Sequence, residues 1–302
     1  MDINHYKPYG TLNKKHLISL ENYTEEEIYE ILKRANDIAE RLDAGEKQSS
    51  LKNKYVYLIT KSGFSRSRIA FETAVTKLSG TFTVSSLPGD KIDSVLTDSL
   101  SMQAIAYYGV DAVVVRTDIT ADAETLDKHV NLPIINANPK SGPLEALSAL
   151  STVWEKKNRL SGLKVAMVGN PSVFAENYLY AFVKCGADVT VICPKELYPD
   201  EKIRNYCAQY GDLSVTDDLT AGLKDADCVF VSDDATMKAY ALTPDKLSVA
   251  KPTALILHSL PITKENSLMS EEVATSPNFA GLRLAENLQK IIMAVLDLLV
   301  AK

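Results

Sequence analysis

Two arginines stand among hydroxyl side chains at a point where a predicted strand passes into a predicted helix. In the segment TKSGFSRSR, Arg66 and Arg68 alternate with Ser65 and Ser67 at the start of an amphipathic stretch. A helix that begins near Ser65 leaves backbone N–H groups without intrahelical partners, and their partial positive charge favours anions. The guanidinium of Arg66 adds a planar fork that matches phosphate. The segment therefore indicates a phosphate site, although a serine N-cap beside two surface arginines would give the same pattern.

Three further apolar runs are followed by side chains that can do chemistry. Arg116 ends the run AVVVR and would add a second guanidinium for the same anion, unless it is a surface side chain. His258 follows ALIL, where it would polarise a carbonyl group or cap the strand. Asp233 and Asp234 follow DCVFVS, where they would favour a cation or form a solvated turn or an N-cap. Ligands of open α/β sheets bind beyond the carboxyl ends of strands, so these residues are the candidates for a site.

The candidate residues are positioned by a chain in which strand and helix patterns alternate. Apolar β-branched runs predict buried parallel strands, and the stretches between them have the periodicity of amphipathic helices. Thr24 and Glu27 open one of these helices with the pattern of a capping box. The predicted strands are 54–60, 81–86, 111–116 and 132–136, then 163–169, 188–193, 227–232 and 253–259. The predicted helices are 24–42, 67–78, 94–109, 143–158, 171–186 and 286–301.

This alternation predicts an α/β fold with two doubly wound parallel sheets, each covered by helices on both faces. The helix at 143–158 separates two sets of four strands and joins the two domains. We therefore expect one domain over 1–142 and a second over 143–285. The chain has 302 residues, which suits two domains of about 150 residues each.

The composition is that of an ordinary globular protein, with 46% apolar and 24% charged residues. The net charge is −6, and no basic surface of the kind that binds nucleic acid is evident. We find no run of about 18 apolar residues and no apolar signal region, so we expect no membrane association. The four cysteines form no CxxC pair and the four histidines are scattered, so we expect buried thiols in a reducing compartment and no metal site.

Taken in order, these motifs resemble the aspartate/ornithine carbamoyltransferase family over nearly the whole chain. SRSRIAFETAVTKLSG is similar to the family stretch S-T-R-T-R-x-S-F-E, and VDAVVVR is similar to the strand that ends in a phosphate-binding arginine. LPIINANPKSGPLEALSALSTVWEKKNRLSGLKVAMVGN follows the family's course from N-A-G-D-G through H-P-T-Q to L-K-V-A-x-V-G-D. LHSLP resembles H-P-L-P or H-C-L-P, and AENLQKIIMAVLDLL resembles the final helix. The likeness is greater to the aspartate carbamoyltransferase catalytic chain than to the ornithine type.

The resemblance implies transfer of the carbamoyl group from carbamoyl phosphate to the amino group of an amino acid or amine, without a metal or organic cofactor. It implies a carbamoyl-phosphate-binding domain over 1–142, with the C-terminal helix 286–302 packed back on it, and an amino-acid-binding domain over 143–285. A cytoplasmic homo-oligomer, most simply a trimer, would follow. Matching positions assign phosphate binding to Ser65, Arg66, Ser67 and Arg116, catalysis to Arg66, Arg116 and His258, and contacts to the carbamoyl group or the amine to Lys91, Glu145, Asp233 and Leu260.

The sequence departs from the family pattern at several of these positions. Gly142 and Glu145 stand where the family has the histidine and the glutamine of H-P-T-Q. That histidine donates to the carbamoyl oxygen, which glycine cannot do. Phe64 replaces the first serine of S-T-R-T-R, and Leu288 follows A-E-N where the ornithine type has arginine. Since the loss of one preorganised donor typically lowers a rate by about 10²–10³-fold, the alternative is an impaired homologue that binds phosphate or another anion without carbamoyl transfer.

The second substrate stays open at this point. Aspartate enzymes of the family bind the dicarboxylate with arginines, but the matching turns here carry Ala175 or Glu176, and Asp233. Two adjacent carboxylates at Asp233 and Asp234 would repel aspartate and favour a cation. The ornithine pattern D-x-x-x-S-M is not cleanly present either.

Overall fold

Each half of the chain builds a parallel sheet, as the alternation of strand and helix patterns predicts. In the computed structural model, the four-stranded unit comprises Lys7–Leu144 and Leu288–Lys302, and the five-stranded unit comprises Met1–Tyr6 and Glu145–Asn287. The division falls inside two helices, α6 (Pro143–Lys157) and α12 (Gly281–Val300). The structure describes residues 2–60, 66–86, 94–116, 131–138, 142–232, 234–262 and 267–301, and for 172–175 and 235 the backbone alone.

The four-stranded sheet places β1 and β3 at its centre. Its order is β2-β1-β3-β4, and all neighbours are parallel. The strand β3 is buried at every position except its last residue, which explains its continuous apolar run. Each of the four strands begins and ends within two residues of its predicted bounds. Their bounds are β1 (Tyr55–Thr60), β2 (Thr81–Ser86), β3 (Ala112–Arg116) and β4 (Ile134–Asn136).

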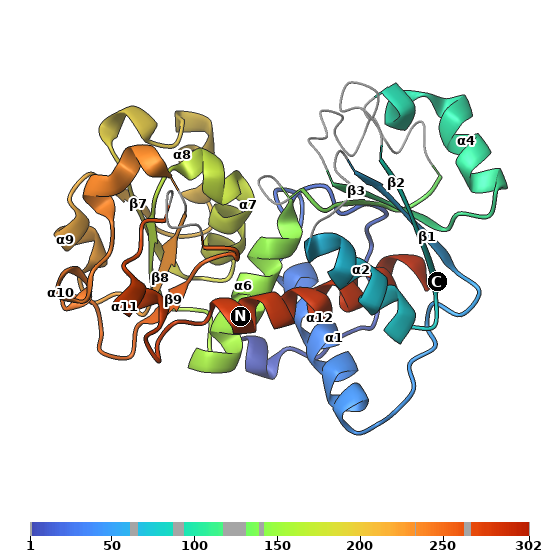
Figure 1. Ribbon diagram of the computed structural model, residues 1–302, viewed down its shortest axis with the longest axis horizontal. Coiled ribbons are helices and arrows are strands. Elements are labelled where there is room, and N and C mark those ends of the chain that lie inside the picture. Colours follow the sequence, from blue (N-terminus) through green and yellow to red (C-terminus); the bar gives the residue numbers. More distant parts are fainter. Residues whose placement is uncertain are drawn as a thin grey trace. The chain divides into compact units, whose positions relative to one another are not determined.

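Helices cover both faces of this sheet (Figure 1). On one face, Met102 of α4 (Ser99–Tyr107) packs into a core with Ile59, Val113 and Val115. On the other side lie α1 (Glu25–Asp43), α2 (Arg66–Lys77) and the second part of α12. The capping box of α1 is confirmed, because Thr24 accepts from the backbone of Glu27 and the Glu27 side chain accepts from the backbone of Thr24. The prediction of one continuous helix over 94–109 is wrong, because the helical residues 94–97 are separated from α4 by Asp98, which caps α4.

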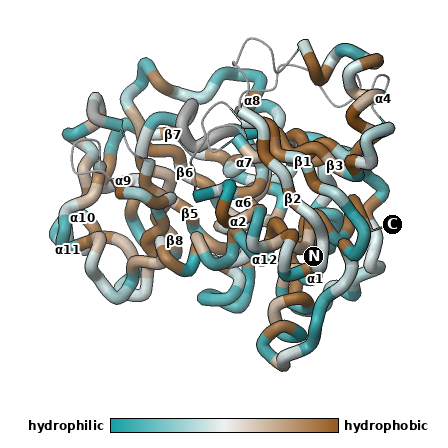
Figure 2. The backbone as a smooth tube through the Cα atoms, turned by 45° about the vertical axis from the view of Figure 1, so that its right-hand side comes forward, coloured by the Kyte–Doolittle hydropathy of each residue, from teal (hydrophilic) through white to brown (hydrophobic). Residues whose placement is uncertain are grey.

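The five-stranded sheet has the order β7-β6-β5-β8-β9, again parallel throughout. Its central strands β5 and β8 appear as apolar segments in Figure 2. The prediction of four strands in this half is wrong, because β7 is a fifth. The segment LSVT of β7 is short and only partly buried at the sheet edge, so it lacks a long apolar run. The bounds are β5 (Lys164–Val168), β6 (Asp188–Ile192), β7 (Leu213–Thr216), β8 (Cys228–Val231) and β9 (Leu255–Leu257).

The remaining helices of the five-stranded unit follow its strands. The longest of them, α7 (Pro171–Lys184), continues directly from the turn after β5. All four cysteines are buried and free, which confirms the prediction of buried thiols. Within the described ranges, no helix is both long enough and apolar enough to cross a membrane. The other helices are η1 (Ile3–His5), η2 (Lys195–Leu197), α8 (Glu201–Cys207), α9 (Leu219–Leu223), η3 (Ala235–Tyr240), α10 (Pro244–Leu247) and α11 (Glu271–Ala274).

The helix α12 begins at Gly281, earlier than the predicted residue 286. Its first turns belong to the five-stranded unit, where Arg283 forms hydrogen bonds of 2.7 and 3.0 Å with both carboxylate oxygens of Glu155 on α6. Its later turns belong to the four-stranded unit, where Asp297 accepts a 2.6 Å hydrogen bond from Arg34 of α1. The expectation that the C-terminal helix packs back on the first domain is confirmed.

Replacing Asn287 by leucine is expected to lower the free energy of unfolding by about 1–3 kcal/mol. Asn287 is fully buried, and its Nδ2 donates to Thr152 Oγ1 at 3.0 Å and to Glu155 Oε2 at 2.9 Å. Leucine would leave both acceptors without this donor in a buried place. Urea unfolding measures the loss, with the exposed Asn205→Leu on α8 as the matched control. Equal stability of the two variants would contradict the role of this contact.

Candidate active site

Arg66 and Arg116 lie at the same edge of the four-stranded sheet. Arg116 is the last residue of β3, and its register partner on β1 is Thr60, the last residue of that strand. From Thr60 the chain reaches α2, whose first residue is Arg66. Arg66 is exposed and Arg116 is half-buried. The sheet order reverses between β1 and β3, and this is the position at which open α/β sheets bind ligands.

The first turn of α2 is also suited to an anion. Ser67 is its second residue and is half-buried. The first turn of a helix directs its backbone N–H groups along the helix axis, where they can donate to an anion. Ser65, Phe64 and Lys91 lie outside the described residues. Arg66, Arg116 and Ser67 are therefore the residues of the predicted phosphate site that lie within the described ranges.

The carboxyl end of β9 carries the predicted residues of the other unit. His258 directly follows the strand and is buried, with 4% of its surface exposed. Leu260 is half-buried, and its bond to Pro261 is cis. Between them, the exposed Ser259 lies 3.5 Å from Glu145 Oε2 and donates a hydrogen bond to it. The structure thus brings Glu145, at the start of α6, to the end of β9.

Asp234 follows β8 and is hydrogen-bonded to a residue that follows the adjacent strand β5 in the same unit. Its Oδ2 accepts a 3.2 Å hydrogen bond from Asn170, which follows β5, while its Oδ1 accepts from the backbone and hydroxyl of Thr236. The hydroxyl of Thr236, and then its backbone and Asn170, hold the pKa of Asp234 below its ordinary value. The N-cap interpretation of Asp234 is confirmed, since it caps η3. Asp233 lies outside the described residues, and so does the side chain of Ala175.

Gly142 occupies a turn that has no space for a side chain. A Cβ atom there would lie 2.5 Å from the carbonyl oxygen of Asn138 and 2.8 Å from that of Asn136. The backbone N–H of Gly142 donates to the Asn138 carbonyl at 2.8 Å, so the turn is closed by a hydrogen bond. The backbone that precedes α6 therefore leaves no room at this position for the histidine of the family pattern.

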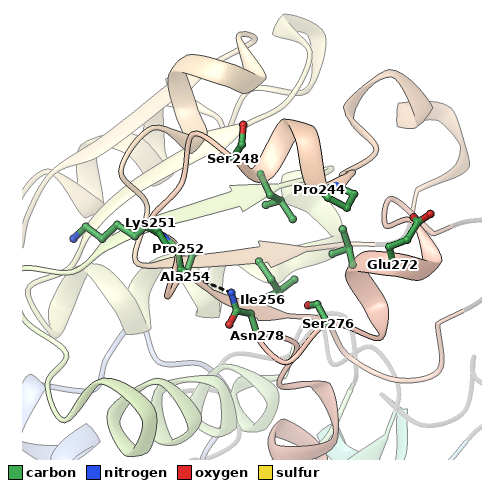
Figure 3. A pocket seen from close by; sticks show the side chains of 11 residues that line it. Pro244, Ser248, Lys251, Pro252, Ala254, Ile256, Glu272, Ser276 and Asn278 are labelled. Atoms are coloured by element: carbon green, nitrogen blue, oxygen red, sulfur yellow. Dashed lines mark hydrogen bonds between the residues drawn. The ribbon is translucent and has the colours of Figure 1, made fainter.

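A cavity of about 190 Å³ lies elsewhere in the five-stranded unit, under α10 and α11 (Figure 3). The side chain of Asn278 closes one wall through a 3.0 Å hydrogen bond to the carbonyl of Pro252. The lining is mainly apolar, and it includes Ala254, which precedes β9, and Ile256 in the middle of this strand, rather than residues at its carboxyl end. Among the described residues, none of those predicted from strand ends lines this cavity.

The chain that places these side chains at the ends of its parallel strands matches two family models in succession. Residues 15–155 match the model described as aspartate/ornithine carbamoyltransferase, carbamoyl-P binding domain. Residues 161–299 match the model described as aspartate/ornithine carbamoyltransferase, Asp/Orn binding domain. The chain belongs to the aspartate/ornithine carbamoyltransferase family. Together the two models account for nearly the whole chain, as the resemblance of its motifs implied.

Relatives of both types reach the same sequence identity to the chain, although most of the similar relatives are of the ornithine type. The ornithine carbamoyltransferase of Pyrococcus abyssi is 29% identical, with 95% of this chain and 96% of the relative covered. The aspartate carbamoyltransferase catalytic subunit of Koribacter versatilis is also 29% identical, with 95% and 97% covered. The solved ornithine carbamoyltransferase of Pyrococcus furiosus superposes with a TM-score of 0.87 at 28% identity, covering 96% of this chain and 98% of that one. Identity alone thus does not separate the two types.

Sequence reasoning overlooked three polar side chains of the second domain, two of them close to strand ends and one within a helix. Ser259 is the last residue of the predicted strand 253–259 and Asn170 directly follows the predicted strand 163–169, so the rule applied to Arg116 and His258 would have found them. Tyr178 had no such signal, because it lies within α7 and its hydroxyl reaches Ser259 only in the folded unit. In the described residues, no group of three or more His, Cys, Asp or Glu side chains is arranged to hold a metal ion.

Proposed function

We propose that the protein transfers the carbamoyl group from carbamoyl phosphate to the amino group of an amino acid or amine. The amine nitrogen attacks the carbonyl carbon, the bond from that carbon to the phosphate oxygen breaks, and the phosphate leaves with the electron pair while the amine loses a proton. The match to both domain models of the family is the observation that carries this proposal. It supports transfer over anion binding without transfer.

The phosphate group is assigned to the edge of the four-stranded sheet. Arg66 and Arg116 supply guanidiniums that neutralise the charge of the leaving phosphate, and Ser65 and Ser67 add hydroxyl donors at the start of α2. Arg66 also stabilises the oxyanion that forms on the carbamoyl group, and Arg116 contacts the carbonyl oxygen. Much of the remaining catalysis is positioning of the two reactants.

The carbamoyl group and the amine are assigned to further residues. The backbone carbonyl of Leu260 accepts from the carbamoyl NH₂, and His258 polarises the carbonyl group. Lys91, Glu145 and Asp233 contact the carbamoyl group or the amine. We further propose that the protein is cytoplasmic and forms homo-oligomers, most simply trimers.

Incubation with carbamoyl phosphate and a panel of amines tests the proposed transfer. After subtraction of the phosphate released without protein, a ureido product and phosphate should appear in equal amounts and only when an accepted amine is present. Thermal unfolding in the presence of phosphate or carbamoyl phosphate examines the anion site separately. Stabilisation by these anions without ureido product from any amine would contradict transfer and favour the binding alternative.

A further inference from the structure

Glu145 presents a carboxylate at the carboxyl end of β9. It lies in the first turn of α6, where an acidic side chain complements the partial positive charge of the helix start. Glu145 is half-buried, and its partner Ser259 is exposed, so solvent reaches this part of the five-stranded unit. A carboxylate has about four acceptor positions, so it can accept from a ligand as well as from Ser259. The carboxyl end of a strand in a parallel sheet is also where ligands bind.

A buried tyrosine extends this contact into a chain of three polar groups. Tyr178 is 7% exposed, and its ring packs edge-on against Phe230 of β8 at 5.7 Å between centroids. Its hydroxyl shares a hydrogen bond with Ser259, which in turn donates to Glu145. Burial, and then the charge of Glu145, raise the pKa of the Tyr178 hydroxyl. The phenol therefore stays protonated near neutral pH, available to hold Ser259 in the orientation that serves Glu145.

Two of these three residues are departures from the family pattern that touch each other. Glu145 stands in place of a glutamine and Ser259 in place of a proline or cysteine. An amide is neutral and both donates and accepts, whereas a carboxylate is charged and only accepts. The change from glutamine to glutamate therefore adds a negative charge at a position where Ser259 donates a hydrogen bond to the side chain. Asp234, which follows β8 and caps η3, is a second carboxylate of the same unit.

We propose that Glu145 binds the positively charged amino group of the acceptor substrate and selects amines of net positive charge over dicarboxylic amino acids. Ser259 and Tyr178 are positioning residues for its carboxylate. This assignment rests on the proposed function, because it names the class of acceptor that the second domain takes.

Calorimetric titration with L-ornithine, 1,4-diaminobutane and L-aspartate tests the selection. The two cationic amines should bind the unaltered protein more tightly than aspartate does. Glu145→Gln, which keeps the shape of the side chain, should raise the Kd of both cations by about 10- to 100-fold, the usual effect of losing a hydrogen bond to a charged group. The matched control is Glu272→Gln, an exposed carboxylate on α11 of the same unit, which should bind as the unaltered protein does.

Variants of the two supporting residues test positioning. Ser259→Ala and Tyr178→Phe should each raise the Kd of the cations by about 2- to 10-fold, and Ser259→Thr, which keeps the hydroxyl, should restore the affinity lost in Ser259→Ala. The inference is overturned if Glu145→Gln binds cationic amines unchanged, or if the unaltered protein binds aspartate as well as it binds the cations. Binding is measured without turnover, so absence of ureido product would refute transfer while leaving this selection to be decided by the titrations.

Discussion

Arg116→Ala is expected to abolish the stabilisation of the protein by phosphate and to lower the rate of ureido product formation by at least about 10²-fold. Arg116 ends β3 beside the end of β1, at the edge of the sheet where α2 begins. A guanidinium forms short, charge-assisted hydrogen bonds with phosphate, and these are about twice as strong as neutral ones. Alanine removes both the charge and the donors.

Arg66→Ala should have the same direction of effect, because Arg66 opens α2 at the same edge. Arg116→Lys keeps the charge but loses the planar fork, so it should retain part of the phosphate stabilisation. The matched control is Arg204→Ala, an exposed arginine on α8. Thermal unfolding with and without phosphate reports binding, and product formation reports turnover. An Arg116→Ala protein that phosphate stabilises as much as the parent would disprove the assignment of this site.

Gly142→His is expected to destabilise the protein rather than restore the histidine of the family pattern. The Cβ of any replacement would meet two backbone carbonyl oxygens, those of Asn138 and Asn136, at 2.5 and 2.8 Å. Backbone atoms cannot rotate away as a flexible side chain can, so the turn must open. Asn136 is itself fixed, because its Nδ2 donates to the carbonyl of Ile18 at 3.0 Å.

Gly142→Ala isolates the steric part of this effect. It should lower the free energy of unfolding by about 1–3 kcal/mol, as is usual when a packed site is overfilled. The control is Gly211→Ala, where a Cβ would lie at ordinary contact distances of 3.4 Å or more. That substitution should be neutral or stabilise the protein by about 0.4–1 kcal/mol, since alanine has less conformational freedom when unfolded. Thermal and urea unfolding compare the two, and a Gly142→Ala protein as stable as the parent would refute the steric argument.

The positions of most strands, and of the arginines proposed to bind phosphate, followed from local sequence. A parallel strand covered on both faces needs a continuous apolar run. In β3 this run ends at Arg116, so the change from apolar to charged residues shows where the strand ends. The segment of β7 fails this rule because an edge strand is covered on fewer sides. The early start of α12 was likewise not predicted from the sequence, because its first turn is fixed by the contact of Arg283 with Glu155 on α6.

The sequence by itself determined that the chain alternates strands and helices, that chemically active side chains follow its strands, and that Gly142 and Glu145 depart from the family pattern. Periodicity and turn chemistry are local properties, so they can be read without coordinates. Only the tertiary structure decided what the departures mean. Glu145, Tyr178 and Ser259 come from α6, α7 and the end of β9, and Gly142 is confined by carbonyl groups of its own turn. The contacts of Glu145 depend on how distant segments pack, which no local pattern encodes, and the space at Gly142 depends on the exact path of the backbone.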